Sequence, residues 1–365
     1  MNLQLEGNKL VYHLDRLHDW YAGKEIFPLY LEIGPSRTCN QRCVHCYVGH
    51  LGFDGVSLEE ELSLKLIDDS AKVGVKGIQL AGCGEPLFNK TLPKAVQKAH
   101  DYKIAVALTT NGVLFNQRLV EQTLHAFTWV RYSVLGYNRE TYGQLHRVNP
   151  KQFDVLLKNM SDAIEYRKKH KLGANLGVAM YVFHENALGV LEFAKLMKEI
   201  GMDYVQVKSA GSSFPDNDYF GKEMYNREGL ATVHADHFKE AERLSNENFA
   251  VKVRWDQFEF SDKSSAGIEA LDLLEGCLSL DFQCVIDSDG KVYTCNGHWG
   301  KEEYCYGDLH KNSFIEIWQS ERKKSITRDL ARKVNYDECY YPCRHYSSNK
   351  FLWDLTHPPL HVNLI

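Results

Sequence analysis

The sequence predicts an α/β protein, with a partial barrel of strand–helix units followed by a small C-terminal domain that contains a β-hairpin. Up to about residue 210, short apolar runs alternate with longer amphipathic stretches. Each polar loop that carries a distinctive motif directly follows one of these apolar runs. In a barrel of parallel strands, functional residues lie in the loops that follow the strands. Near residue 212 the alternation stops, and a hairpin signature appears further along the chain.

The barrel elements follow from the different periodicities of strands and helices. Residues 8–24 place Leu10, Leu14 and Leu17 at helical spacing, which predicts a packed N-terminal helix. Residues 61–74 read as an amphipathic helix between two strands. Six strands are predicted, at residues 29–34, 77–82, 103–110, 129–134, 176–182 and 204–209. Six strand–helix units of this kind predict a partial (β/α)6 barrel of the TIM type with right-handed crossovers.

The second half of the chain has a different composition. Residues 212–220 are polar and rich in turn residues, and a helical stretch follows at 228–248. Residues 282–295, FQCVIDSDGKVYTC, form two β runs joined by a Ser-Asp-Gly turn, which predicts a hairpin. We therefore divide the chain into an N-terminal extension (1–28), a core barrel (29–212), a linker with a helical completion of the core (213–260), an auxiliary domain (261–350) and an apolar tail that packs back on the body (351–365).

The bulk properties exclude several functional classes. A net charge of -5 and a pI near 6.4 argue against a nucleic-acid binder, which needs a basic face. There is no apolar run long enough for a membrane span, and the N-terminus lacks the layout of a secretory signal, so we expect a cytoplasmic protein with no membrane partner. Ten cysteines in a reducing compartment predict metal or redox chemistry rather than disulfides.

Three of these cysteines lie close together in the loop after the first strand. Cys39, Cys43 and Cys46 follow the pattern CxxxCxxC, and the aromatic Tyr47 comes directly after them. Thiolates are soft ligands for zinc and for iron–sulfur clusters. Zinc sites usually pair CxxC units around four ligands, whereas three thiols can hold three irons of a [4Fe–4S] cube and leave the fourth iron open. The spacing favours iron–sulfur over zinc or buried structural thiols.

The cysteine loop and three later segments resemble the radical S-adenosylmethionine (SAM) enzymes. Residues 82–86, GCGEP, are similar to the glycine-rich motif that binds the amino group of SAM, and residues 109–112, TTNG, to the segment that contacts its ribose. Residues 129–147 look like the fourth-strand segment that holds the SAM carboxylate. The resemblance assigns the cofactor contacts to Tyr47, Gly82, Gly84, Glu85, Pro86, Thr110, Asn111, Ser133 and Arg147.

The resemblance also explains why there are three cysteines. In this family SAM chelates the open iron, and an electron from the cluster releases a 5′-deoxyadenosyl radical that removes hydrogen from a substrate. It implies that the glycines of GCGEP let the backbone approach SAM and that Glu85 takes the SAM ammonium group. Tyr47 contacts the adenine or packs over the cluster, and the alternative for Arg147 is an ordinary surface cation.

A second set of cysteines lies in the last third of the chain. Cys277, Cys295, Cys339 and Cys343, with Gly290 inside the hairpin, resemble the shortened "twitch" form of the SPASM domain, which holds one auxiliary [4Fe–4S] cluster. The cysteines of a second auxiliary cluster are missing. The alternatives are that Cys284 or Cys305 replaces one of these ligands, or that the four thiolates form a structural zinc site.

Two radical reactions fit this layout. In the first, hydrogen is removed from a hydroxyl-bearing carbon and the auxiliary cluster accepts an electron, as in the twitch-domain aminocyclitol dehydrogenases. In the second, a cysteine returns hydrogen to the substrate radical and inverts a stereocentre. The remaining thiols are Cys83, Cys284 and Cys305, which ordinarily would be small buried hydrophobes. The catalytic candidates are Cys305, Cys284 and Lys208, the last at the end of the sixth strand.

Oxidation of a small polar substrate, a sugar or cyclitol, is the favoured reaction. Peptide or protein modification is the third alternative. Peptide-modifying members often begin with a leader-binding domain, for which a cysteine loop that begins at residue 39 leaves no room. Sulfatase maturases lack that domain too, but they resemble the full two-cluster form of the SPASM domain. The expected partners are this substrate and a low-potential electron donor, a flavodoxin or a ferredoxin. Outside the enzymes, the alternative is an iron–sulfur carrier or a zinc protein, neither of which needs an open iron or a SAM loop.

Overall fold

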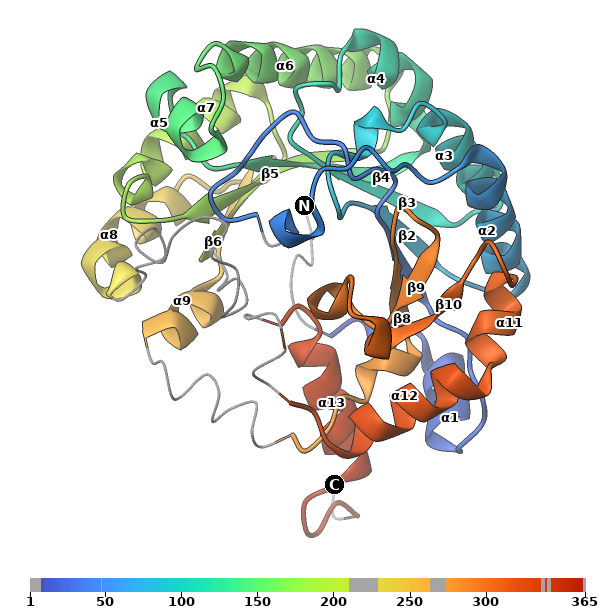
Figure 1. Ribbon diagram of the computed structural model, residues 1–365. Coiled ribbons are helices and arrows are strands. Elements are labelled where there is room, and N and C mark those ends of the chain that lie inside the picture. The colour runs from blue at the N-terminus through green and yellow to red at the C-terminus, as the bar shows by residue number, and fades with distance from the viewer. Residues whose placement is uncertain are drawn as a thin grey trace.

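The protein forms a curved sheet whose convex face is covered by helices (Figure 1). The computed structural model describes residues 8–46, 48–209, 229–262, 274–335, 339 and 343–363. The sheet has ten strands in the order β10-β9-β8-β1-β2-β3-β4-β5-β6-β7. The barrel strands are β1 (Tyr30–Ile33), β2 (Gly77–Leu80), β3 (Ala105–Thr110), β4 (Phe127–Val134), β5 (Asn175–Val182), β6 (Tyr204–Ser209) and β7 (Ala250–Val253).

Neighbouring barrel strands are all parallel, which confirms the predicted α/β architecture. The six predicted strands are present, and β7 is a seventh that the sequence analysis missed. The helices of the barrel are α2 (Glu60–Lys72), α3 (Leu92–Asp101), α4 (Gln117–Thr123), α5 (Arg139–His146), α6 (Gln152–His170), α7 (Val190–Ile200), α8 (Leu230–Glu242) and α9 (Trp255–Asp262). The short strand β7 escaped notice because its four residues include a lysine and follow a polar turn.

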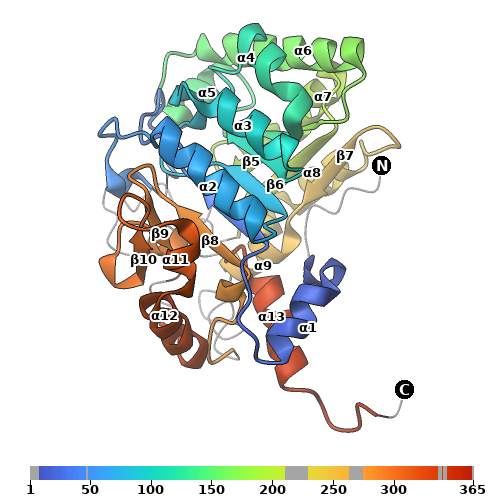
Figure 2. The ribbon, with the colours of Figure 1, turned by 90° about the vertical axis from the view of Figure 1, so that its right-hand side faces the viewer.

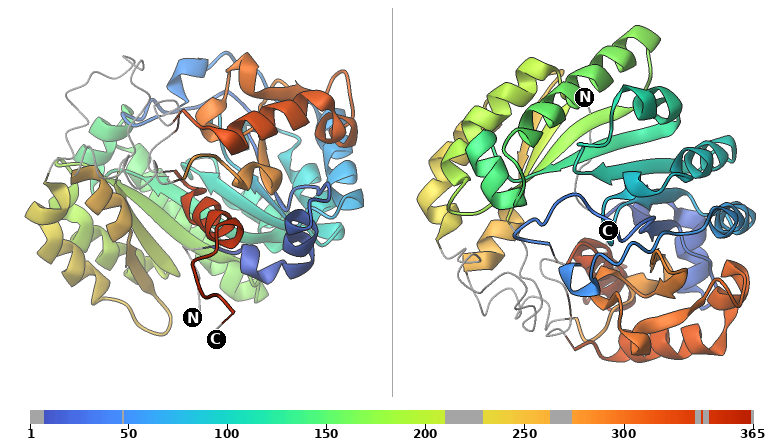
Figure 3. Two further views of the ribbon diagram at one scale, coloured as in Figure 1. Left: turned by 90° about the horizontal axis from the view of Figure 1, so that it is seen from below. Right: turned by 45° about the horizontal axis from the view of Figure 1, so that its top comes forward.

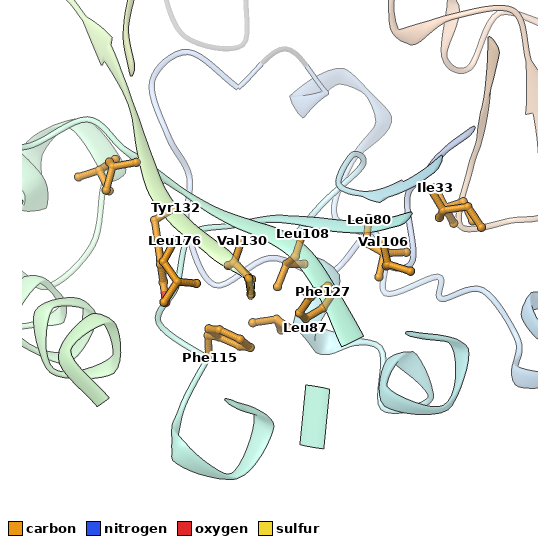
Figure 4. Packing of buried hydrophobic residues seen from close by; sticks show 14 of the residues in the cluster. Ile33, Leu80, Leu87, Val106, Leu108, Phe115, Phe127, Val130, Tyr132 and Leu176 are labelled. Atoms are coloured by element: carbon orange, nitrogen blue, oxygen red, sulfur yellow. The ribbon is translucent and has the colours of Figure 1, made fainter. Parts of the chain in front are cut away.

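Each strand turns alternate side chains to opposite faces of the sheet. On β4, Val130, Tyr132 and Val134 are fully buried in the main hydrophobic core, which lies between the sheet and the helices (Figure 4). Arg131 and Ser133, on the other face of the same strand, therefore point to the barrel interior. The interior is thus lined by polar residues, while the apolar residues are used for helix packing.

The C-terminal hairpin joins the same sheet. It consists of β8 (Gln283–Ile286) and β9 (Lys291–Tyr293), which pair antiparallel as predicted, and a third strand, β10 (Cys305–Asp308), follows. Strand β8 pairs in parallel with β1, with Leu31 opposite Cys284. The auxiliary segment therefore extends the barrel sheet at its first strand and does not form a detached layer (Figure 3). Helices α11 (Phe314–Gln319) and α12 (Glu321–Arg332) follow β10 in the chain.

A small second core joins the two ends of the chain. Leu10, Leu17, Phe282 and Leu352 belong to one buried cluster, so α1 (Leu14–Tyr21) and α13 (Tyr346–Thr356) pack on the same group of side chains (Figure 2). The prediction that leucines near the N-terminus pack against the body is therefore confirmed for Leu10 and Leu17, but Leu14 is 69% exposed. In the described part of the chain, no helix combines the length and the apolar character that crossing a membrane requires.

Candidate active site

The three-cysteine loop lies after β1 and is fastened to the end of α5. The backbone N–H groups of Arg42 and Val44 donate to the carbonyls of His146 and Leu145, at 3.1 and 3.0 Å. Burial raises the pKa of the Cys39 thiol to about 12. Burial, and then the charges of Cys46 and Cys39, raise the pKa of Cys43 as well. Three thiols held this close repel one another as thiolates, so this donor set fits a cationic iron–sulfur cluster that would offset the repulsion.

His146 lies directly against the second cysteine of the loop. Its Nδ1 is 3.1 Å from the Cys43 Sγ and 2.8 Å from the Gln41 Oε1. The Leu135 N–H donates to its Nε2 at 3.0 Å, and the Gln41 side-chain amide donates to the Tyr142 hydroxyl at 2.7 Å. The sequence analysis missed His146 because 103 residues separate it from Cys43.

The two SAM-like motifs after β2 and β3 meet at Glu85. Its buried carboxylate accepts hydrogen bonds from the backbone N–H groups of Leu87 and Asn111, at 3.2 and 2.7 Å, and from the Thr110 hydroxyl at 2.7 Å. Burial raises the pKa of Glu85 to about 7. The Asn111 side chain in turn donates to the Asn40 Oδ1 at 2.7 Å, within the cysteine loop. Three loops that are distant in sequence therefore form one hydrogen-bonded unit, as the barrel topology predicts.

The two glycines of GCGEP are required by contacts within the chain, and their predicted contacts with the cofactor stay predictions. A Cβ on Gly84 would lie 2.6 Å from the carbonyl oxygens of Ser36 and Thr38. Gly82 has a φ of +107°, and a Cβ there would lie 2.8 Å from the Trp299 ring. Each glycine lets the β2 loop touch a neighbouring segment, the cysteine loop in one case and the auxiliary domain in the other.

The remaining predicted SAM contacts are less closely grouped. Ser133 is half-buried on the inward face of β4. Arg147 is exposed and ends α5 in the left-handed conformation, with a φ of +52°. Pro86 is the last residue of GCGEP and the first of a short 3-10 helix. Tyr47 lies outside the described residues. The cofactor roles of these four residues stay predictions.

Three of the four predicted auxiliary ligands come together. Burial raises the pKa of Cys277, and the nearby charge of Cys343 adds to this effect. Cys295 feels the charge of Cys277, and Cys343 feels that of Cys295, with burial the larger cause in both cases. These mutual effects show that the three thiols lie in one region, and thiolates are the donors that an iron–sulfur cluster needs. Among the residues that the structure describes, no three such side chains are close enough to share a single metal ion. The fourth, Cys339, has its Sγ 3.8 Å from the Asn335 carbonyl oxygen, and the residues on either side of it lie outside the described part of the chain.

The other thiols lie elsewhere. Cys284 is fully buried in the main core, on the opposite face of β8 from the barrel interior. Cys305 is buried in a small cluster with Val48, Tyr293 and Trp299. Both thiols are packed among apolar side chains, and the assignment of the auxiliary ligands stays a prediction. Cys83 donates to the buried Asp287 carboxylate at 2.8 Å.

A buried carboxylate ties the auxiliary loops to the barrel wall. Glu32 on β1 accepts from the Asn296 side chain at 2.8 Å and forms an ion pair with Arg344. Asn296 follows Cys295 and Arg344 follows Cys343, so each contact holds the residue next to an auxiliary ligand. The sequence analysis passed over Glu32, although a glutamate inside an apolar strand is an unusual choice.

Lys208, the catalytic candidate at the end of β6, lies among other cations. Lys208 is half-buried and points inward from β6, with its Nζ 5.5 Å from the centre of the Tyr181 ring. Burial and the nearby cations Arg131, Arg254 and Arg344 lower its pKa.

Comparisons with known proteins agree with this geometry. The profile of the Radical SAM superfamily matches residues 33–197, and that of SPASM, an iron–sulfur cluster-binding domain, matches residues 277–345. Together they cover more than half of the chain.

Among curated relatives, the chain is 23% identical over 334 residues to the tungsten-containing aldehyde ferredoxin oxidoreductase cofactor-modifying protein of Pyrococcus furiosus, with 85% of each chain covered. It is 28% identical over 177 residues to a GTP 3′,8-cyclase of Desulforamulus reducens, with 47% of this chain and 52% of the cyclase covered.

Among solved structures, Streptococcus suis SuiB bound to S-adenosylmethionine has a similar fold. The TM-score is 0.63 at 16% identity, with 87% of this chain and 73% of SuiB covered. SuiB has also been solved with the precursor peptide SuiA. The two family profiles span the cysteine loop, the two motif loops after β2 and β3, and the four predicted auxiliary cysteines. The chain therefore belongs to the radical SAM superfamily, carries a SPASM iron–sulfur domain, and is an enzyme that binds SAM with a [4Fe–4S] cluster and an auxiliary iron–sulfur cluster.

Proposed function

We propose that the protein oxidises an alcohol carbon of a small polar molecule of the sugar or cyclitol class. When bound, SAM and its cluster supply a radical that removes the carbon-bound hydrogen atom, and the auxiliary cluster supplies an acceptor for the remaining electron. The hydroxyl proton leaves to a base, so that two hydrogens in all are lost from the substrate. In this proposal Cys277, Cys295, Cys339 and Cys343 hold the acceptor.

The observation that carries the proposal is the position of the auxiliary thiols at the barrel wall. Glu32 lies on the inward face of β1 and binds the residues that follow Cys295 and Cys343. An acceptor held by these loops lies beside the barrel interior, where a substrate of this fold is positioned. Electron transfer to it then needs no movement of a domain, because β8 belongs to the same sheet as β1.

The choice of a small substrate is supported by two considerations. The interior faces of the strands carry polar side chains, among them Glu32, Gln79, Arg131 and Lys208, which suit a polar molecule. The relative that is matched over 85% of both chains is named for the modification of a cofactor. SuiB, which binds a precursor peptide, shares the fold at 16% identity, and peptide modification is therefore an outcome that the experiment must separate.

The thiols bear on the epimerase alternative. Epimerisation needs a cysteine that delivers hydrogen to the substrate carbon. Cys284 points away from the barrel interior into the main core, and Cys305 is 3% exposed within an apolar cluster. Cys305 lies on the other face of the extended sheet, in the cluster that contains Cys83 and against which Cys46 packs. The placement of Cys284 therefore favours oxidation, whereas Cys305 is the thiol whose role the experiment must separate.

The mass of the product tests the proposal. Reconstituted protein with SAM, a flavodoxin or ferredoxin reducing system and a panel of sugars and cyclitols should give a product two hydrogens lighter than its substrate. In heavy water no deuterium should be fixed at carbon. A Cys277→Ala variant should still form 5′-deoxyadenosine but give no oxidised product, because it lacks an auxiliary ligand.

Two results would contradict oxidation. A product of unchanged mass that gains one deuterium at carbon, together with a strict need for Cys305 or Cys284, would establish epimerisation. Turnover of peptides with no turnover of any small polar alcohol would instead place the protein among the peptide-modifying enzymes. Mass spectrometry of both reaction sets distinguishes the three reactions.

A further inference from the structure

The barrel interior carries more positive than negative side chains. Arg131 on β4 and Lys208 on β6 both lie on the inward faces of their strands, since their neighbours Val130 and Val207 are buried in the main core. Arg254 follows β7, and Arg344 enters from the auxiliary domain. The charges of the three arginines are near enough to Lys208 to lower its pKa, so the four cations share one region.

Two of these cations have carboxylate partners, and two do not. Arg344 pairs with Glu32, and Arg254 pairs with Asp256 at 2.6 Å. Among the residues that the structure describes, no carboxylate lies within ion-pair distance of Arg131 or Lys208. Arg131 donates weakly to the Thr109 hydroxyl at 3.4 Å, and its Nε is buried without a hydrogen-bond partner.

Such an arrangement is costly unless a ligand completes it. A buried guanidinium N–H without an acceptor loses its hydration without compensation. Like charges in the same region add repulsion. An oxyanion offsets both costs, because it accepts charge-assisted hydrogen bonds from Arg and Lys together.

We propose that Arg131 and Lys208 bind an anionic group of the substrate, a carboxylate or a phosphate, inside the barrel. This inference rests on the proposed function, since it names the substrate class of the same site and requires the sugar or cyclitol to be an acid or a phosphate ester. The anion holds one end of the substrate, and the hydroxyl-bearing carbon lies toward the SAM loops. Neutral sugars and cyclitols leave the two cations uncompensated and bind weakly.

Binding of simple anions to the reconstituted holoenzyme tests this site without SAM or reductant. Inorganic phosphate and acetate are titrated separately by calorimetry. We expect saturable binding at one site, weakened at least tenfold by Arg131→Met and by Lys208→Met. Lys195→Met, which removes an exposed lysine on α7, is the matched control and should bind like the wild type. Tighter binding of phosphate than of acetate indicates a phosphate ester, and the reverse indicates a carboxylic acid.

Three results would overturn the anion site. They are the absence of saturable binding, equal binding by all three variants, and displacement of phosphate by SAM, which would assign the cations to the SAM carboxylate. Because no step uses SAM cleavage, these failures are separate from a failure of the oxidation experiment. Iron content and the circular dichroism spectrum of each variant verify that it is folded and loaded.

A second inference concerns His146 and rests on different contacts. Since the Leu135 N–H donates to Nε2, the neutral ring carries its hydrogen on Nδ1. The Gln41 amide is oriented by its bond to Tyr142, so its oxygen faces that hydrogen. The Nδ1–H therefore points between the Gln41 Oε1 and the Cys43 Sγ.

We propose that His146 is a positioning residue that donates an N–H···S hydrogen bond to Cys43 and thereby raises the reduction potential of the SAM cluster. Reduction adds negative charge to a cluster and its thiolates, and a hydrogen bond to a ligand sulfur stabilises that charge. Electron delivery to the cluster is then easier than it would be with an unsupported thiolate.

Two substitutions separate this role from simple support of the loop. In His146→Asn, the side-chain amide nitrogen takes the place of Nδ1 and can still donate a hydrogen bond to Cys43. In His146→Gln, the side-chain amide oxygen takes the place of Nε2, so it still accepts from the Leu135 N–H, but the donor to Cys43 is lost. In a redox titration followed by electron paramagnetic resonance, His146→Gln should lower the ratio of reduced to oxidised SAM cluster at a fixed potential about tenfold, which is about 59 mV for one electron. His146→Asn should stay near the wild type. Equal potentials in all three proteins, or the lower potential in His146→Asn, would refute the hydrogen bond's role.

Discussion

Replacing Cys39, Cys43 and Cys46 together by Ala is expected to remove one of two iron–sulfur clusters and to abolish SAM cleavage completely. Two [4Fe–4S] clusters correspond to about eight irons per chain, and the variant should retain about four. The loss is complete because the chelation of SAM requires the iron that this loop holds. Iron analysis after anaerobic reconstitution and chromatography of 5′-deoxyadenosine measure the two effects.

Cys284→Ala is the control for this experiment. Cys284 is fully buried in the main hydrophobic core, so its loss should leave both clusters and SAM cleavage in place. The claim of two clusters fails if the wild type holds about four irons and one tightly bound zinc. Retention of SAM cleavage by the triple variant would show that another set of residues holds the first cluster.

Loss of Glu32 should release the auxiliary cluster while the SAM cluster stays. In Glu32→Ala, Arg344 loses its ion pair and Asn296 loses its acceptor, and both residues adjoin auxiliary ligands. In this ion pair Glu32 is buried, whereas the Arg344 side chain is 37% exposed. Removing Glu32 should therefore lower the free energy of unfolding by about 2–3 kcal/mol, which is less than the loss expected for a fully buried pair. Iron content should fall toward about four per chain, and the urea midpoint should fall with it.

Glu302→Gln is the matched control, since Glu302 lies in the same domain and pairs with Lys291 and Arg322 at the surface. Its side chain is 72% exposed, so its replacement should change the stability by less than about 0.5 kcal/mol. If Glu32→Ala keeps both clusters at wild-type stability, Glu32 does not anchor the auxiliary loops, and the proximity argument for electron transfer loses its support.

The sequence by itself determined the fold class and the family, and it predicted the thiols of the first cluster. These features are local: strand–helix alternation is legible in each segment, and CxxxCxxC places three ligands within eight residues. The hairpin was also predictable, because a Ser-Asp-Gly turn between two β runs specifies the pairing of its neighbours. Such features depend only on residues that are close together in the sequence.

Only the tertiary structure decided which residues support those ligands. Glu32 lies 264 residues from Asn296 and 312 from Arg344, and such contacts depend on β8 pairing with β1 in one particular register. A shift by one residue would exchange the two faces of β8, and Cys284 would then point to the barrel interior instead of the main core.

The same reason applies to the two cations of the proposed anion site and to the glycines of the SAM motif. Arg131 and Lys208 share the interior because the pleat of β4 and β6 turns both inward, a fact of sheet curvature and register. Gly82 and Gly84 are required by contacts with Trp299 and with the cysteine loop, which no local pattern in GCGEP records. Local sequence specifies a strand or a loop, but contacts between distant segments exist only once the sheet has closed around a common interior.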